Sequence, residues 1–417
     1  MTSSAPLFEP LQLPNGAIIP NRLCKAAMEE NLSEEGQLPG ERLFTLYKRW
    51  AEGGAGLILT GNVMISPAAL TGPGGVVLEA GTPLERFEKW AAAGRSHGAQ
   101  FWMQINHPGR QVYADMKEEA VSASAVGVNI PGFSKLFPTP RALTGSEVEA
   151  IIERFATTAA LAEKSGFTGV QIHAAHGYLI SQFLSPLTNQ RDDEWGGSLE
   201  NRARFLLRTV EAVRAKVAPS FCVSVKLNSA DFQKGGFDQN DAKWVVGKLN
   251  TMGVDLVELS GGSYESPAMQ GRTDESSTSK REAYFIDFAR DIATVANMPV
   301  MVTGGIRKLQ TAVDALTVDE AGTGVSILGI ARALAFEPDL PNNWKAGRKT
   351  EVQVPEVTWK SKPLAGLATM ALAKAQLERM ADGKPAKPDI SPVMALIAER
   401  WRTRKRTKRY RRWRDAA

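Results

Sequence analysis

Eight short runs of apolar and β-branched residues recur along the chain, each followed by a segment with the pattern of an amphipathic helix. The runs span residues 22–28, 56–65, 99–105, 167–173, 221–227, 254–260, 298–304 and 324–330. Apolar residues are continuous within each run, which is typical of parallel strands covered by helices. Eight strand–helix units predict an α/β fold, the closed (β/α)8 TIM barrel. A doubly wound open sheet is disfavoured, because no glycine-rich phosphate loop follows the first run.

Some of the helical segments have clear boundaries. One helix is predicted from about Thr144 to Ser165, and another after Ser198, a residue type that caps helix N-termini. A third predicted helix, near the surface, contains His97, which we therefore expect to be inert. In the helix after Ser198 the apolar residues step by four and three and so share one face: Leu199, Ala203, Leu206, Val210, Val213 and Val217.

Length and composition indicate a globular protein. The chain has 417 residues, of which 43% are hydrophobic, and it contains no apolar stretch long enough to cross a bilayer. The first twenty residues include no basic residue, which is wrong for a secretory signal, so we expect a cytoplasmic protein. Cys24 and Cys222 each lie in an apolar run and are expected to be buried thiols, since two cysteines are too few for a cysteine-ligated iron–sulfur cluster.

The positive net charge comes from the C-terminal end. Residues 400–417 hold ten basic residues and one acid, so the other 399 residues sum to −4. We therefore expect three parts: a barrel (1–345), a helical extension (346–399) and a basic tail (400–417). A charge run usually indicates a solvated, partly ordered end. Because Trp401, Tyr410 and Trp413 stand among the arginines, binding to an anionic membrane or to nucleic acid is an alternative hypothesis.

The C-terminal ends of barrel strands carry the active site in this fold. Two of the four histidines, His173 and His176, stand three apart where the fourth run ends. This spacing differs from the i, i+4 pair of helical zinc proteases, and a strand that ends at the first and turns at the second could aim both imidazoles at one oxygen or anion. Tyr178 follows, and its neutral phenol could donate a proton. Two alternatives remain: the histidines are a loop pair whose hydrogen bonds are made within the protein, or they bind a metal.

Other strand ends indicate a cofactor. Gly304 and Gly305 follow the seventh run, and Ala331 and Arg332 follow the eighth, where barrels commonly bind phosphate. Asn62 stands at the end of the second run. The side chains of two further strand-end residues suit the pyrimidine edge of a flavin, an amide by its paired donor and acceptor and an amine by its charge: Gln104 and Lys226.

The stretch "IHAAHGYLISQFLSPLTNQRDDEWGGSLENRARF" closely resembles the signature of the old yellow enzyme family of FMN-dependent oxidoreductases. "QINHPGR", "VKLNSADFQKGGF", "VTGGI" and "GIARALAFEPDLP" add to the resemblance, which covers roughly residues 6–345. It implies FMN at the barrel mouth, with its phosphate on Gly304, Gly305 and Arg332 and its pyrimidine side on Gln104 and Lys226. No metal is implied, and the chain is too short beyond the barrel for the second flavin domain of larger relatives.

The resemblance also implies a reaction. NADH or NADPH would reduce FMN, and hydride would pass to the β-carbon of an α,β-unsaturated carbonyl compound. His173 and His176 would bind the carbonyl oxygen, and Tyr178 would protonate the α-carbon. An ene-reductase is therefore expected, with a metal-dependent barrel hydrolase or a non-catalytic flavin-binding protein tethered by its basic tail as alternatives. The sequence does not distinguish NADH from NADPH, name the alkene, or decide whether the chain forms a homo-oligomer.

The chain departs from the family pattern beside the cofactor. Where many relatives read Ala-Pro-Met followed by Thr or Cys, it has Ala26, Ala27, Met28 and Glu29. We expect the carboxyl of Glu29 to give the flavin a different reduction potential. Lysine replaces the commoner arginine at position 226, which keeps the charge and loses the planar fork, and Trp195 replaces a tyrosine.

Overall fold

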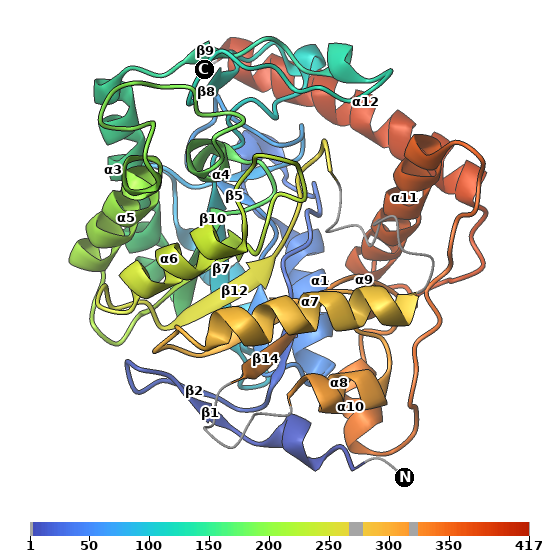
Figure 1. The fold of residues 1–417 in the computed structure, drawn as a ribbon. Helices are drawn as coiled ribbons and strands as arrows, with labels where there is room; N and C mark the ends of the chain where they lie inside the picture. The colour runs from blue at the N-terminus through green and yellow to red at the C-terminus, as the bar shows by residue number, and fades with distance from the viewer. Residues whose placement is uncertain (1–2, 267–277, 317–323, 417) are drawn as a thin grey trace.

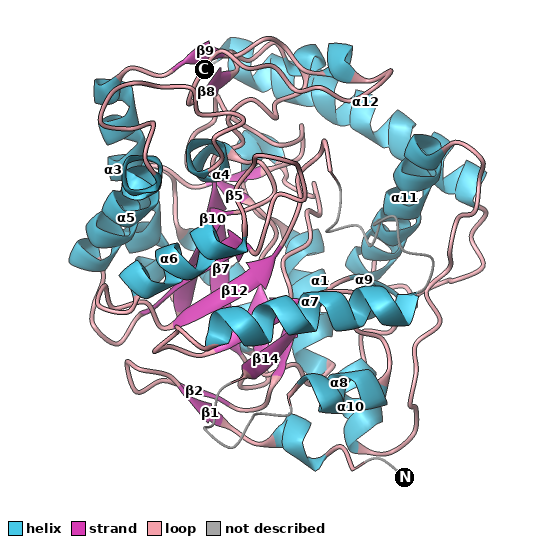
Figure 2. Ribbon diagram, in the orientation of Figure 1, coloured by secondary structure: helices cyan, strands magenta, loops and turns pink. Residues whose placement is uncertain are grey.

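The computed structural model describes residues 3–266, 278–316 and 324–416. Eight parallel strands close into a barrel, with β10 paired to both β7 and β11 and β14 paired to β3, so the predicted fold is confirmed (Figures 1 and 2). Each predicted run matches one barrel strand to within one residue at its C-terminal end or contains it entirely: β3 (Leu23–Lys25), β4 (Leu57–Leu59), β7 (Gln100–Asn106), β10 (Gly169–Ala174), β11 (Cys222–Asn228), β12 (Leu256–Ser260), β13 (Val300–Thr303) and β14 (Val325–Ile330).

Helices surround the barrel, and the predicted boundaries have clear causes. Thr144 and Glu147 form a capping box at the start of α3, and the hydroxyl of Ser198 accepts a hydrogen bond from the Asn201 N–H at the start of α5. The surrounding helices are α1 (Glu41–Glu52), α2 (Glu85–Arg95), α3 (Gly145–Lys164), α5 (Leu199–Lys216), α6 (Gln239–Leu249), α7 (Thr278–Ala293), α8 (Leu309–Ala315), α9 (Arg332–Phe336) and α10 (Leu340–Lys345).

The barrel has a closed end and a mouth. After the 3-10 helix η1 (Ala5–Phe8), the hairpin of β1 (Leu11–Gln12) and β2 (Ile18–Ile19) lies at the end opposite the mouth, and its Leu13 and Ile19 pack with apolar residues inside the barrel. Cys24 and Cys222 belong to this interior and are free buried thiols, as expected.

Short elements between the strands and helices build the mouth. After β4 come β5 (Val63–Met64) and β6 (Val76–Val77), which extend the sheet beyond β7. The others are η2 (Glu35–Gln37) after β3, η3 (Ala114–Met116), β8 (Val121–Ser122), η4 (Ser134–Leu136) and β9 (Arg141–Ala142) after β7, and α4 (Leu179–Leu184) after β10.

The C-terminal region forms two long helices, α11 (Lys362–Ala381) and α12 (Pro392–Ala416). Helix α12 continues without a break through residue 400 and crosses the mouth end of the molecule (Figure 1). Tyr410 is fully buried and packs with Met64, Leu70 and Met116 from the mouth segments. Its hydroxyl donates to the Pro67 carbonyl at 2.8 Å. The expected solvated end is therefore a docked helix.

Four basic residues of α12 contact the rest of the protein. Arg402 and Arg406 pair with Glu378 of α11, and Arg414 lies 2.8 Å from Glu118 in the segment after β7. Arg409 donates to the Ser33 carbonyl. The sequence pattern of a charge run is the same whether its residues are solvated or paired with distant acids. The docking of α12 could therefore not be predicted from that pattern.

His97 is outside the helix in which we expected it. Helix α2 ends at Arg95, and His97 is exposed in the following turn, with Nδ1 3.0 Å from the Ser96 hydroxyl. None of the helices in the three described segments is long and apolar enough to cross a membrane.

We predict that Tyr410→Phe loosens α12, because it removes the hydroxyl that contacts the half-buried Pro67 carbonyl and the Glu118 carboxylate. A lost hydrogen bond of this kind costs about 1–2 kcal/mol. Tryptic cleavage within α12 should therefore become about tenfold faster. Trp401→Phe, a similar change at a side chain that is 66% exposed, is the control and should leave cleavage unchanged. Equal rates in the Tyr410 variant and the wild type would contradict this docking.

Candidate functional site

The two histidines lie at the end of β10 with their rings side by side. His173 is the fifth residue of the strand, and His176 follows in the turn; the ring centroids are 5.1 Å apart. His173 Nδ1 accepts a hydrogen bond from the Ala175 N–H at 3.2 Å, so the proton of the neutral ring is on Nε2. His176 Nε2 is 2.8 Å from the Ser260 hydroxyl, which orients its ring. The pair can thus present hydrogen-bond donors to one ligand.

The turn that aims His176 is strongly held. His176 has a left-handed backbone with φ of 61°, a conformation that needs outside support in a non-glycine residue. Its N–H donates to the Asn228 side chain at 3.1 Å, and its carbonyl accepts from Gln111 at 3.1 Å. Gly177 follows with φ of 72°. Hydrogen bonds from neighbouring segments therefore hold the turn that carries His176.

Both imidazoles are neutral near pH 7. Desolvation lowers the pKa of His173 well below its usual value, and the electrostatic influence of His176 and of the Lys226 ammonium lowers it further. Burial first, and then the charge of Lys226, lowers the pKa of His176 in the same way. Neutral rings donate hydrogen bonds without bringing a charge into the site.

Tyr178 stands beside the histidine pair. Its ring meets that of His173 edge to face at 4.8 Å, and its side chain is almost fully buried. Burial raises the pKa of Tyr178, and the carboxylate of Glu29 raises it further; hydrogen bonds with Tyr264 and Asn62 act the other way. Tyr178 is therefore a protonated phenol, able to donate.

A chain of buried polar side chains crosses the barrel mouth. Gln104 Nε2 donates to Gln171 Oε1 at 2.7 Å, and Gln171 Nε2 donates to Glu258 Oε2 at 2.8 Å. Lys226 Nζ donates to the other oxygen of Glu258 at 2.6 Å. All four residues are buried. The structure thus brings Gln104 and Lys226 together as predicted, joined by Gln171 and Glu258, which sequence reasoning missed.

The ends of β13 and β14 approach each other closely. Thr303 pairs with Gly329, and a Cβ on Gly329 would stand 1.9 Å from Thr303 Oγ1, so only glycine fits. Thr303 Oγ1 is buried and has no hydrogen-bond partner among the described residues. Gly304 and Gly305 continue from β13, whereas Ala331 and Arg332 continue from β14, so the four predicted residues share one side of the mouth.

The segment after β3 lies next to the end of β14. Ala26 is buried and donates its N–H to the Ile330 carbonyl at 3.0 Å; Ala27, Met28 and Glu29 are partly exposed. Glu29 accepts a hydrogen bond from the Thr71 hydroxyl. Asn62 follows β4, and its side-chain oxygen is buried and lacks a hydrogen-bond partner within the described part of the chain.

Below this segment lies a buried cluster that supports it. Lys25 donates to the Leu59 carbonyl at 2.7 Å, and Tyr47 donates to Glu30. The Gly61 N–H also donates to Glu30, at 3.1 Å. Desolvation lowers the pKa of Lys25 to about 8. The cluster joins the ends of β3 and β4 and so fixes the segments that carry Met28 and Asn62.

These features fit a flavin mononucleotide. Within the described residues, the buried side-chain oxygens of Asn62 and Thr303 have no protein partner and could bind a polar ligand. Gly304, Gly305 and Arg332 stand at the strand ends where barrels commonly bind phosphate. The amide of Gln104 and the amine of Lys226 suit the edge of a pyrimidine ring. Within the described segments, no group of three or more histidine, cysteine or acidic side chains could hold a metal ion.

Comparison with known proteins gives the same picture. The sequence matches the NADH:flavin oxidoreductase / NADH oxidase family over residues 6–351. It is 38% identical over 355 residues to the NADH-dependent flavin oxidoreductase iliE of Hypocrea jecorina, covering 80% of this chain and 87% of that protein. It is 34% identical over 423 residues to the NADH-dependent flavin oxidoreductase nadA of Aspergillus parasiticus, covering 96% and 92%, so this match extends beyond the barrel.

Solved structures agree. The old yellow enzyme homologue from Zymomonas mobilis has a TM-score of 0.70 at 25% identity, over 84% of this chain and 94% of that chain. Morphinone reductase in complex with tetrahydroNAD has a TM-score of 0.69, also at 25% identity, over 84% and 93%.

Fold, site and matches together define a flavin-dependent barrel oxidoreductase. The chain belongs to the NADH:flavin oxidoreductase / NADH oxidase family and is of the old yellow enzyme type. Its cofactor is FMN, and a nicotinamide dinucleotide is the electron donor. The hydrolase alternative is therefore set aside.

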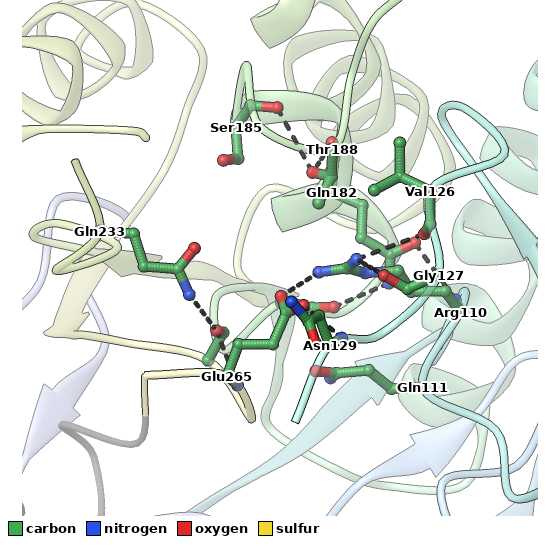
Figure 3. A network of polar contacts seen from close by, with 12 residues as sticks. Arg110, Gln111, Val126, Gly127, Asn129, Gln182, Ser185, Thr188, Gln233 and Glu265 are labelled. Carbon is green, nitrogen blue, oxygen red and sulfur yellow. Dashed lines mark hydrogen bonds and ion pairs between the residues drawn. The ribbon is translucent and has the colours of Figure 1, made fainter. Parts of the chain in front are cut away.

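Several polar residues around the histidines carried no sequence signal that we used. Arg110 lies in the quoted "QINHPGR" motif, yet its partner Glu265 is 155 residues away. Figure 3 shows this pair joined to the backbone of Val126, Gly127 and Asn129. Such contacts depend on which loops meet over the mouth, and the strand pattern does not specify that.

We predict a pH dependence of stability from the depressed histidine pKa values. The unfolded chain takes up protons below pH ~6.5, whereas the folded site does not, so stability falls as the pH drops through this value, by up to ~1.4 kcal/mol per pH unit for each histidine. Urea unfolding at pH 7, 6 and 5 should show a smaller loss for the double variant His173→Asn/His176→Asn. The exposed His97→Asn is the control. The same loss in all three proteins would contradict the prediction.

Proposed function

We propose that the protein reduces the C=C bond of α,β-unsaturated carbonyl compounds. The observation that carries this proposal is the neutral histidine pair beside a buried, protonated tyrosine. Two neutral donors on one oxygen stabilise the negative charge that develops there when the β-carbon accepts hydride. A phenol next to them can then complete the reduction on carbon. Quinones and nitro compounds are expected as further acceptors.

Each residue would have a definite task. His173 and His176 would bind the carbonyl oxygen, and Tyr178 would protonate the α-carbon. Gln104 and Lys226 would hold the pyrimidine side of the cofactor, with Ala26, Ala27, Met28, Glu29 and Asn62 along its other contacts and Gly304, Gly305, Ala331 and Arg332 at its phosphate. When bound, FMN would supply the hydride that it has taken from the nicotinamide.

The donor is proposed to be NADH. The support is that the two relatives described above are both called NADH-dependent. A comparison of NADH and NADPH as reductants of the same enzyme preparation decides the preference, and faster reduction by NADPH would contradict the proposal.

The test of the function follows both half-reactions in one cuvette. The purified protein should show a flavin spectrum that bleaches with NADH under anaerobic conditions and returns with 2-cyclohexenone. His176→Asn should slow only the return, by about 10²–10³-fold, because the donor acts on the substrate oxygen. His97→Asn is the control. If NADH bleaches the flavin but no enone or quinone reoxidises it, the proposed activity is contradicted, and the protein binds flavin without it.

We further propose that three charges beside FMN set its reduction potential. The positive charge of Lys226 is balanced by the negative charge of Glu258, with which it forms an ion pair. Glu258→Gln removes the negative charge and should raise the potential, whereas Lys226→Met removes the positive charge and should lower it. Glu29→Thr, which removes a carboxyl from the other edge, should also raise it. A change of about 1.4 kcal/mol corresponds to about 30 mV for a two-electron couple. Equilibrium titration against redox dyes measures the shift, and identical potentials in all four proteins would contradict the proposal.

The outer face of α12 is proposed to meet an anionic membrane surface. Its first turns expose Val393, Met394, Ile397 and Trp401, by 52–66%, and Arg404, Lys405 and Lys408 are exposed beyond them. Apolar side chains next to cations suit a lipid interface better than nucleic acid, and repulsion between like charges disfavours a symmetric dimer through this face.

The membrane proposal can be tested on the intact enzyme. Vesicles containing phosphatidylserine should retain the protein at low salt, and vesicles of phosphatidylcholine should not. Arg404→Glu together with Lys408→Glu should abolish retention, since each cation contributes about 1 kcal/mol. Arg208→Glu with Lys216→Glu, on α5, is the charge-matched control. Binding to duplex DNA, or dimerisation lost in the α12 variant, would favour those partners instead.

A further inference from the structure

A second phenol stands behind Tyr178. Tyr264, in the loop after β12, has its hydroxyl oxygen 3.0 Å from that of Tyr178, and the two rings meet edge to face at 6.0 Å. We propose that Tyr264 is a positioning residue that acts through Tyr178: it holds the Tyr178 hydroxyl in place and donates a hydrogen bond to the phenolate that Tyr178 becomes. This inference rests on the proposed reduction of an enone.

Residues 261–266, the described segment after β12 that carries Tyr264, are held in place through the neighbouring Glu265. Glu265 forms an ion pair with Arg110, whose side chain is only 3% exposed, and it also accepts a hydrogen bond from the Asn129 N–H at 2.7 Å. Arg110 in turn donates to the Gly127 carbonyl at 2.8 Å. Figure 3 shows Arg110 and Glu265 facing one another across this network. The pair joins residues 261–266 to the loop after β7.

The other side of the loop is tied to the histidine turn. Ser263 forms an isolated parallel β-bridge with His176, and its hydroxyl accepts a hydrogen bond from the Glu265 N–H at 3.2 Å. The ring of Tyr264 lies 6.1 Å from that of Phe137, which stacks on Tyr113 at 5.4 Å. Tyr264 therefore has little freedom to leave Tyr178.

The chemistry needs such a partner. In the proposed step, the O–H bond of Tyr178 breaks and a C–H bond forms at the substrate α-carbon, which leaves a phenolate in a buried place. A phenolate accepts strong hydrogen bonds, and the Tyr264 hydroxyl is within reach to donate one. A proton from water then restores Tyr178 before the next turnover, so no other reactant is needed.

The electrostatics have the right direction. Burial and the Glu29 carboxylate raise the pKa of Tyr178, which makes it a weak acid, and the hydrogen bond with Tyr264 lowers that pKa. The pKa of Tyr264 itself is raised, first by burial, so Tyr264 keeps its proton and remains a donor. The hydrogen bond with Tyr264 therefore reverses part of the rise in the pKa of Tyr178 that burial and Glu29 cause.

A different role for Tyr264 would be simple contact with the substrate. The two roles predict different couplings, which a double-mutant cycle separates. If Tyr264 acts through Tyr178, its hydroxyl has no further effect once the Tyr178 hydroxyl is gone. If it contacts the substrate, the two losses add.

The experiment uses the FMN-loaded enzyme reduced with NADH. Reoxidation by 2-cyclohexenone, which needs a proton on carbon, is compared with reoxidation by menadione, whose protons go to oxygen. Tyr264→Phe should slow the enone reaction about tenfold, the loss expected for one hydrogen bond to a charged group, and leave the quinone reaction unchanged. In the Tyr178→Phe background it should cause no further loss. Tyr113→Phe, from the same aromatic wall, is the control and should change neither rate.

A spectroscopic measurement supplements the rates. In protein labelled with 3-fluorotyrosine, the ¹⁹F resonance that Tyr178→Phe removes should move in Tyr264→Phe and stay in place in Tyr113→Phe. Flavin content shows that each variant is folded. Additive losses in the double variant, equal slowing of the quinone reaction or an unmoved resonance would overturn this inference alone. A wild-type enzyme that reoxidises with menadione and never with an enone would overturn the proposed function as well.

Discussion

The register of the parallel strands around β10 determines the site. Gln171 of β10 pairs with Gln104 of β7, and His173 pairs with Lys226 of β11. Lys226 then pairs with Glu258 of β12. A shift of one residue in any of these ladders would turn a functional side chain to the opposite face of the sheet. Closure of the barrel through β10 and β7 therefore both builds the core and sets the polar groups of the mouth side by side.

The same register allows charges to be buried there. Lys226 and Glu258 are almost fully inaccessible, and isolated charges in such places are very unfavourable. Here the lysine donates to one carboxylate oxygen and Gln171 donates to the other, so the acid is satisfied on both sides. Removal of one partner of a buried pair typically costs about 3–5 kcal/mol. A cofactor edge laid on Gln104 and Lys226 would therefore meet groups whose orientation is already set.

Much of this organisation could be predicted from the sequence, because it depends on local patterns. Continuous apolar runs are what a covered parallel strand requires, and each of the eight barrel strands lies within a predicted run or extends one residue beyond it. The N-caps at Thr144 and Ser198 follow from the hydroxyl that each supplies. The histidines, Gln104 and Lys226 were found because strand ends of a barrel share one face.

The missed features are contacts between segments far apart in the chain. The loop pairing of Arg110 with Glu265 and the hydroxyl contact of Tyr178 with Tyr264 depend on loop shapes that have no period. The docking of α12 depends on acids such as Glu118 and Glu378, which have no pattern that marks them as partners of arginines. His97 was assigned to a helix because its segment is alanine-rich, yet the helix stops two residues earlier.

The most direct test of the central claim is the identity of the product formed from 2-methyl-2-cyclohexenone by the enzyme with NADH in D₂O. The account predicts a saturated ketone in which deuterium occupies the α-carbon as a single stereoisomer, because a fixed phenol delivers that proton to one face. An allylic alcohol, or a ketone with deuterium on both faces equally, would contradict it.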